Sequence, residues 1–235
     1  MRQDVKMSKI EDHETHVQEK EGVVWDLPLR IFHWLLMASV IGSIASAKTE
    51  NMFWHEKFGL TVSGLVMFRI IWGFTGSHHA RFGNFMVSPS ALAAYIRERI
   101  GGNRIPHPGH APTGAYATLL ILLVLAGMAS LGMMSNDDVL YEGPLAVYVG
   151  GFTNTASTLH HRGEIFIFAL IALHLGAILM YRFVLGIRLL PAMIKGGHDP
   201  RIKRISTFHQ GAGIALMITL IAAMQLLGLL GDRFY

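Results

Sequence analysis

The chain has 235 residues, of which 51% are hydrophobic and 15% are charged. It is more apolar and less charged than an average globular domain, so a membrane protein is the first class to consider. Cysteine is absent, which excludes disulfides, thiolate metal sites, iron–sulfur clusters and covalently attached c-type haem. The formal net charge is +4, but the basic residues are shared between short loops, which favours membrane topology over nucleic-acid binding.

The chain begins with a polar segment, residues 1–22, of mixed charge. It has no apolar core and no small-residue cleavage site, so we expect a flexible tail rather than a signal peptide. Five apolar windows follow, at 29–47, 57–76, 113–134, 163–186 and 209–231. Each is within or close to the length of about 17 to 25 residues that crosses a bilayer. The third is apolar on every side, which argues against a soluble fold. The sequence therefore predicts an all-α integral membrane protein with five helices.

The connecting segments differ in charge. The stretch "SPSALAAYIRERIGG" between the second and third windows predicts a short interfacial helix, capped by Ser88 or Ser90. Basic residues lie in the second and fourth connections: Arg81, Arg97, Arg99 and Arg104, then Arg188, Lys195, Arg201, Lys203 and Arg204. Residues 135–159 contain no Lys or Arg but include Asp137, Asp138 and Glu142. The positive-inside rule predicts a cytoplasmic amino terminus and an outward-facing carboxyl terminus.

Most of the 13 histidines lie in the tail or in loops, but four lie at membrane depth or at the edge of a window. These are His33, His55, one of His160 and His161, and His174. Ionisable residues at such positions are rare and usually face the bundle interior. His160 and His174 are separated by 14 residues, which leaves them about 40° apart around a helix and about 21 Å apart along it. His161 points about 140° away from His174, so His160 is the predicted inward residue.

The predicted topology sorts the four histidines into two pairs by depth. His55 and His160 are expected near the outer side, and His33 and His174 nearer the cytoplasm. Two imidazoles from different helices at one level suit ligation of a haem iron on both faces of the macrocycle. Zinc would need three or four ligands at one point. A structural role, in which each histidine bonds a backbone carbonyl across helices, remains the alternative; it would not require pairing by depth.

Arg69 stands 14 residues after His55, on nearly the same helix face and at the level of His33 and His174. A charge at that depth needs a partner, and a haem propionate or a quinone carbonyl would serve. The alternative is that the side chain snorkels to cytoplasmic headgroups. Gly59 lies near His55 and would leave bare backbone for a haem, although such glycines serve helix packing equally well.

Several motifs together give the chain a family resemblance. They are "VWDLPLRIFHWLL", "WHEKFGLTVSGLVMFRIIWGFTGSHHARF", "GHAPTGA", "LHHRGEIFIFALIALH" and "LLPAMIKGG". The chain resembles the bacterial cytochrome b561 family, in the branch related to the b-type cytochrome subunits of nickel–iron hydrogenases. The resemblance implies a four-helix transmembrane haem-binding bundle over residues 23–197. It also implies two haem b groups, with the metal ligands carried over to His33, His55, His160 and His174.

The resemblance further implies a function in the bacterial inner membrane. Members relay electrons between quinone or quinol and a periplasmic redox partner such as a cytochrome c or a hydrogenase. The acidic loop over 135–159 would suit docking of a basic cytochrome c. A superoxide oxidase that reduces quinone, and a non-redox membrane scaffold or transporter, are the alternatives. Residues 198–235 add a fifth helix beyond the usual core, and because its apolar part has no ionisable residue we expect packing or partner contact there.

Overall fold

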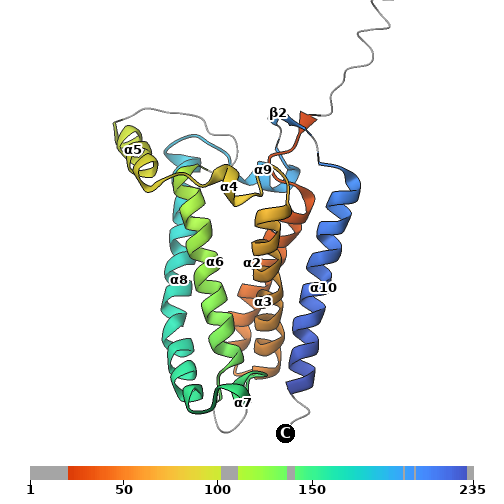
Figure 1. Ribbon diagram of the computed structural model, residues 1–235. Coiled ribbons are helices and arrows are strands. Elements are labelled where there is room, and N and C mark those ends of the chain that lie inside the picture. The colour runs from red at the N-terminus through yellow and green to blue at the C-terminus, as the bar shows by residue number, and fades with distance from the viewer. Residues whose placement is uncertain (1–20, 102–110, 137–140, 198, 204, 232–235) are drawn as a thin grey trace, which may run out of the picture.

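The computed structural model describes residues 21–101, 111–136, 141–197, 199–203 and 205–231. Within these residues, five helices are long and apolar enough to cross a membrane. They are α2 (Leu27–Lys48), α3 (Met52–Thr75), α6 (Pro112–Met133), α8 (Thr153–Phe183) and α10 (Thr207–Gly231). Figure 1 shows the long helices running side by side, with α8 and α10 on opposite flanks. The predicted all-α, five-helix membrane fold is confirmed. The predicted tail lies, except for its last two residues, outside the described residues.

Two helices begin five or more residues earlier than their apolar windows. α3 starts at Met52 and α8 at Thr153, whereas the windows start at 57 and 163. Hydropathy windows miss these first turns because the turns carry polar side chains, while a helix needs only its backbone hydrogen bonds and a cap. In α3 the Asn51 side chain provides that cap by accepting a hydrogen bond from the Trp54 backbone nitrogen at 3.2 Å. His55 and His160 therefore lie within helices and not before them.

Helix α3 is the central element of the bundle. It packs against α2, α6 and α10, and α8 packs against α6. Of its most apolar 18-residue window 56% is buried, against 11% to 22% in the other four spans. Phe68 and Leu65 are fully enclosed, and Trp72 is nearly so. Because α3 lies at the centre, its side chains pack against three other long helices.

Glycines allow the backbones of neighbouring helices to approach closely. A Cβ atom added at Gly64 of α3 would lie 2.7 Å from the Cα atom of Ile221 in α10. A Cβ atom at Gly42 of α2 would lie 2.7 Å from the Phe58 ring of α3. Small residues at such contacts are the usual means by which helices associate in a membrane. The fifth helix is thus packed directly on the backbone of α3.

The remaining elements are short. One end of the bundle holds α4 (Phe82–Phe85), α5 (Pro89–Ile100), α9 (Leu190–Lys195) and a two-stranded antiparallel sheet of β1 (Glu21–Gly22) and β2 (Asp199–Lys203). We call it the basic end, since it carries the two basic connections. The opposite end holds α7 (Ala146–Val149) and a 3-10 turn, η1 (Gly150–Phe152), and we call it the α7 end (Figure 1). The short helix predicted between the second and third windows is present as α5, whose cap is Ser88: its Oγ accepts from the Ala91 nitrogen.

At the basic end, two buried carboxylates hold the segments that flank the helices. Asp26 caps α2 through the Leu29 nitrogen at 2.8 Å and accepts from Trp72 Nε1 at 3.0 Å, which joins α2 to α3. Asp199 in β2 accepts two hydrogen bonds from Arg201 and lies 3.1 Å from His79 Nε2. The hydrogen bonds from Arg201 lower the pKa of Asp199 well below its usual range, so the carboxylate stays ionised at neutral pH. The short strands have no sequence signal because this pairing links residues far apart in the chain.

The Gly64 contact yields a test of how α10 is attached. Gly64→Val should lower the free energy of unfolding by about 1–3 kcal/mol, because neither backbone can yield to the added atoms. Gly211→Val is the matched control, since nothing lies within 4 Å of a Cβ atom at that position of α10. Thermal unfolding of both variants in detergent measures the difference. Equal stability of the two would contradict the close α3–α10 packing.

Candidate functional site

The four histidines singled out in the sequence lie in the bundle as two pairs. The ring centres of His55 on α3 and His160 on α8 are 5.9 Å apart. Those of His33 on α2 and His174 on α8 are 6.5 Å apart. We call the first pair the α7 level and the second the basic-end level. Each level therefore has two imidazoles from two helices close together, with ring planes inclined by 78° at the α7 level and by 50° at the basic-end level.

At the α7 level, the Nδ1 atoms of both imidazoles bond to backbone carbonyls. His55 Nδ1 lies 2.9 Å from the carbonyl oxygen of Ser43 in α2, and His160 Nδ1 lies 2.9 Å from that of Met128 in α6. A carbonyl can only accept, so Nδ1 carries the proton in both rings. In a neutral imidazole the other nitrogen, Nε2, then has a free lone pair, which is the form that binds a metal.

A cavity of about 400 Å³ lies beside this level. Its walls come from α2, α3, α6 and α8, and they include both His55 and His160. Gly59 belongs to the wall, and a Cβ atom there would meet nothing within 4 Å. This glycine faces open space, unlike Gly64, which packs against α10. The cavity is mostly apolar, and its volume is in the range of pockets that hold small organic ligands, about 300–1,000 Å³.

The rim of the cavity carries charged residues in pairs. Lys48 of α2 forms an ion pair with Glu164 of α8, which crosses the space between the two helices. Glu56 of α3 pairs with the neighbouring Lys57 at 2.9 Å. His161 is exposed and also belongs to the cavity wall, with its ring centre 6.3 Å from that of His160. The expected orientation of His161 toward the outer surface agrees with its exposure, although the residue lies closer to the cavity than its helical angle suggests.

At the basic-end level the imidazoles are less enclosed by protein groups. His33 is half-buried, and its Nδ1 atom has no hydrogen-bond partner among the described residues. His174 is exposed on the same level. The ring of Trp34 lies edge-on to that of His33, with centres 5.3 Å apart.

Arg69 is the most deeply buried cation of the described chain, at 1% exposure. Neither Nη1 nor Nη2 has a hydrogen-bond partner among the described residues. Its guanidinium carbon lies 4.7 Å from the ring centre of Phe82 and 5.9 Å from that of Phe85, both in α4. Aromatic rings compensate only part of the free energy of burying a cation. Snorkelling to headgroups is wrong for this residue, because its head group is enclosed rather than in water.

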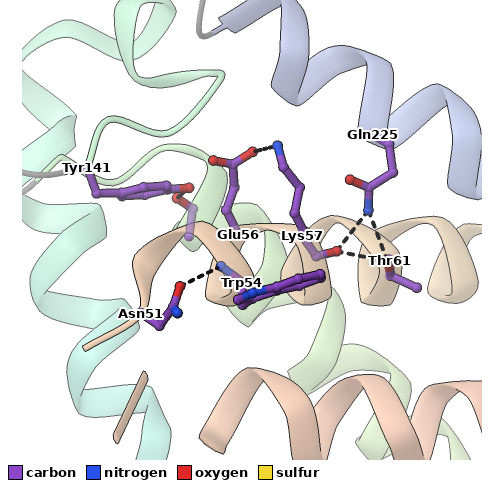
Figure 2. A network of polar contacts seen from close by, with 8 residues as sticks. Asn51, Trp54, Glu56, Lys57, Thr61, Tyr141 and Gln225 are labelled. Carbon is purple, nitrogen blue, oxygen red and sulfur yellow. Dashed lines mark hydrogen bonds and ion pairs between the residues drawn. The ribbon is translucent and has the colours of Figure 1, made fainter. Parts of the chain in front are cut away.

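The structure also contains a polar network that sequence reasoning missed. Gln225 of α10 donates from Nε2 to the Lys57 carbonyl at 2.8 Å and to Thr61 Oγ1 at 3.0 Å. Figure 2 shows this amide beside the Glu56–Lys57 ion pair. The fifth helix therefore contacts the turn of α3 that follows His55. Nothing in the apolar pattern of α10 signals this contact, since it depends on which face of α10 meets α3.

The described residues do not offer a multi-ligand metal site. No group of three or more His, Asp or Glu side chains converges in that part of the chain. Each of the two levels offers two imidazoles as possible metal ligands.

Comparison with known proteins gives one family. The family model described as prokaryotic cytochrome b561 matches residues 24–196, the span that contains all four histidines and Arg69. β2 and α10 lie beyond the matched residues. No curated protein and no solved structure gives a significant match.

The position of His160 can be tested through the glycine that faces it. A Cβ atom at Gly132 of α6 would lie 3.0 Å from His160 Cε1, so Gly132→Val should displace the imidazole and weaken any metal centre at the α7 level. Gly127→Val, on the same helix with nothing within 4 Å of a Cβ atom, is the control. The absorbance spectrum reports the metal centre and circular dichroism reports the fold. Identical spectra for the two variants would argue against a functional His160.

Proposed function

Because the chain belongs to the prokaryotic cytochrome b561 family, we propose that it is a di-haem cytochrome relaying electrons between the quinone pool and a periplasmic redox partner. The family consists of b-type cytochromes of the membrane that take part in electron transfer. The two haems, their ligands, the quinone and the partner are the proposed part. The observation that carries the proposal is the close approach of two imidazoles from different helices at each of two levels.

The spacing of the imidazoles suits one iron atom between them. Metal–imidazole nitrogen bonds are about 2 Å long, so two imidazoles on opposite sides of one iron have ring centres about 6 Å apart. The observed separations are 5.9 Å at the α7 level and 6.5 Å at the basic-end level. A purely structural role would not require the imidazoles to lie in pairs at this separation. We therefore propose His33, His55, His160 and His174 as the iron ligands.

At the α7 level the protein prepares both ligands before any metal binds. The Ser43 and Met128 carbonyls hold the protons on Nδ1 and orient the rings. Such outer hydrogen bonds fix the tautomer of a ligating histidine and raise its basicity. Gly59 leaves the cavity beside His55 open for a macrocycle. A carbonyl bond across helices, the structural alternative considered from the sequence, is present at this level, but it engages Nδ1 alone and is compatible with ligation through Nε2.

At the basic-end level, Arg69 supports a cofactor with acidic groups. Its two buried Nη atoms have no acceptor among the described residues, and a carboxylate can accept from both in a bidentate pair. We propose that Arg69 binds a propionate of the haem held by His33 and His174. The Phe82 and Phe85 rings keep water from this pair and hold the guanidinium in place.

Haem iron supplies one-electron chemistry, and the chain supplies orientation, dielectric and hydrogen bonds. His160 and His174 lie on one helix, about 21 Å apart along its axis, so α8 spans both levels. We propose that electrons pass between these two levels. In this proposal residues 23–197 form the di-haem core, and residues 198–235 add an accessory helix. The bacterial inner membrane, with the basic end toward the cytoplasm, is the proposed location.

The proposed partner would dock on the acidic loop at the α7 end. Asp137 and Asp138 of the acidic loop lie outside the described residues, while Glu142 lies within them. A basic cytochrome c or a hydrogenase-type partner remains the proposal for this end. Superoxide oxidation is less supported, because Lys48 and Lys57, two cations that would steer superoxide, are each engaged by a carboxylate.

The ligand assignment predicts which histidine substitutions change the haem spectrum. His→Ala at 33, 55, 160 and 174 should each remove or disturb one haem, because one axial bond is lost. His161→Ala is the matched control and should leave both haems. The haem-to-protein ratio and the dithionite-reduced minus oxidised spectrum measure the effect. The absence of b-type bands in the unmodified protein would refute the proposed function, and loss of haem only in His161→Ala would refute the choice of ligand.

The Arg69 assignment predicts a selective effect on one level. Arg69→Met keeps the volume but removes the charge-assisted hydrogen bonds, so haem retention at the His33–His174 level should weaken about 10- to 100-fold. Arg69→Lys should retain part of it, and Arg97→Met on α5 should have no effect. Haem release during dilution or dialysis, followed spectroscopically, measures this. Unchanged retention in Arg69→Met would show that Arg69 does not bind the cofactor.

A further inference from the structure

A second cavity, of about 630 Å³, opens at the basic end and is separate from the histidine levels. Four segments form its wall: the segment between β1 and α2, the end of α3 with its connection to α4, strand β2, and the start of α10 with the residues before it. The wall residues are Val23, Thr75, Gly76, Ser77, His78, Arg81, Arg201, Ile205, Ser206 and His209. From the sequence, Arg81 and Arg201 are expected only to set the membrane topology.

The ionisable residues of this wall are all basic. They are His78, Arg81, Arg201 and His209, and the wall contains no carboxylate. Arg81 is exposed and makes no ion pair within the described residues. Burial and the charges of His79 and Arg81 lower the pKa of His78, which is the expected response of an imidazole near other cations. The cavity therefore presents an excess of positive charge.

The carboxylate of Asp199, in strand β2 beside this wall, is already engaged. Asp199 is 3% exposed and accepts from Arg201 Nε at 2.8 Å and from Arg201 Nη2 at 2.9 Å. An arginine has five N–H donors, so this pair orients the guanidinium and leaves other donors free. Asp199 thus holds Arg201 at the cavity wall instead of filling the cavity with a negative group.

Uncharged donors add to the cations. Ser77 is 9% exposed, and its Oγ atom is buried without a hydrogen-bond partner among the described residues. His209 Nε2 lies 2.9 Å from the Thr75 carbonyl, which joins the start of α10 to the end of α3. α10 is a long helix, and the positive end of its dipole lies at this wall. A buried hydroxyl, two guanidinium groups and a helix amino terminus together match the acceptor oxygens of a phosphate.

We propose that this cavity binds a phosphate group, carried either by an anionic phospholipid of the adjoining leaflet or by a soluble phosphate compound. Basic pockets between transmembrane helices at the cytoplasmic side are suited to phospholipid headgroups. Arg81 neutralises the anion. Arg201, whose charge is paired with Asp199, donates hydrogen bonds to the anion from its remaining N–H groups, and Ser77 and the start of α10 donate hydrogen bonds as well. The bound group joins β2 and α10, which lie outside the family match, to α3 in the core. The proposal does not depend on the haem assignment.

Native mass spectrometry of the full-length, haem-loaded protein tests the lipid source. The protein is reconstituted in nanodiscs with equal amounts of phosphatidylglycerol and phosphatidylcholine, and retained lipid is counted. The unmodified protein should retain phosphatidylglycerol selectively, and Arg81→Gln should lose about tenfold of that affinity. Arg97→Gln is the control, because it removes the same charge from α5 at the same end of the bundle. Ser77→Ala should weaken retention without changing net charge.

Titration with inorganic phosphate tests the soluble source in the same variants. If phosphate raises the unfolding temperature of the unmodified protein but not of Arg81→Gln, and no lipid is selected, the ligand is a soluble phosphate compound. The proposal is overturned if neither phosphate nor phosphatidylglycerol binds. It is also overturned if Arg81→Gln and Arg97→Gln lower binding equally, since that result indicates only general surface charge. Circular dichroism and the haem spectrum confirm that each variant is folded.

Discussion

The hydrogen bonds from the Nδ1 atoms of His55 and His160 to backbone carbonyls are the interactions on which the α7 level depends. A polar ring inside an apolar bundle is costly unless its nitrogens are satisfied. The carbonyls of Ser43 and Met128 satisfy one nitrogen of each ring and leave the other nitrogen as a donor of electrons. The same bonds connect α3 to α2 and α8 to α6, so the geometry of the proposed iron site and the packing of four helices are set together.

Helix α3 links the parts of the molecule that differ in role. It carries His55 at one level and Arg69 near the other, and its opposite side is packed against α10 through Gly64. Gln225 of α10 bonds to the α3 turn after His55, and His209 bonds to the last turn of α3. The fifth helix is therefore attached to α3 at both ends of the bundle. Through these two contacts, α10, which lies outside the family match, is hydrogen-bonded to α3 near both proposed haem levels.

The two levels differ in how many of their polar atoms have a hydrogen-bond partner within the protein. At the α7 level, backbone carbonyls and an apolar cavity already define the positions of the rings. At the basic-end level, His33 Nδ1 and the Nη atoms of Arg69 remain without partners among the described residues. Unpaired buried polar groups are rare in native proteins and call for an explanation. The proposed haem would supply a carboxylate for the Nη atoms of Arg69, whereas His33 Nδ1 has no partner among the described residues.

The sequence alone was sufficient for the five-helix membrane fold and for the grouping of four histidines by depth. Both follow from local quantities, namely the length of an apolar window and the 100° turn per residue of a helix. The predicted starts of α3 and α8 were late by five and ten residues. The first turns of both helices carry polar side chains, so each apolar window begins after its helix does. The sequence could not separate Gly59, which faces a cavity, from Gly64, which packs against α10, because the two differ only in what another helix places opposite them. For the same reason, the enclosure of Arg69, the contacts of Gln225 and the cationic cavity between α3, β2 and α10 were decided by tertiary structure alone.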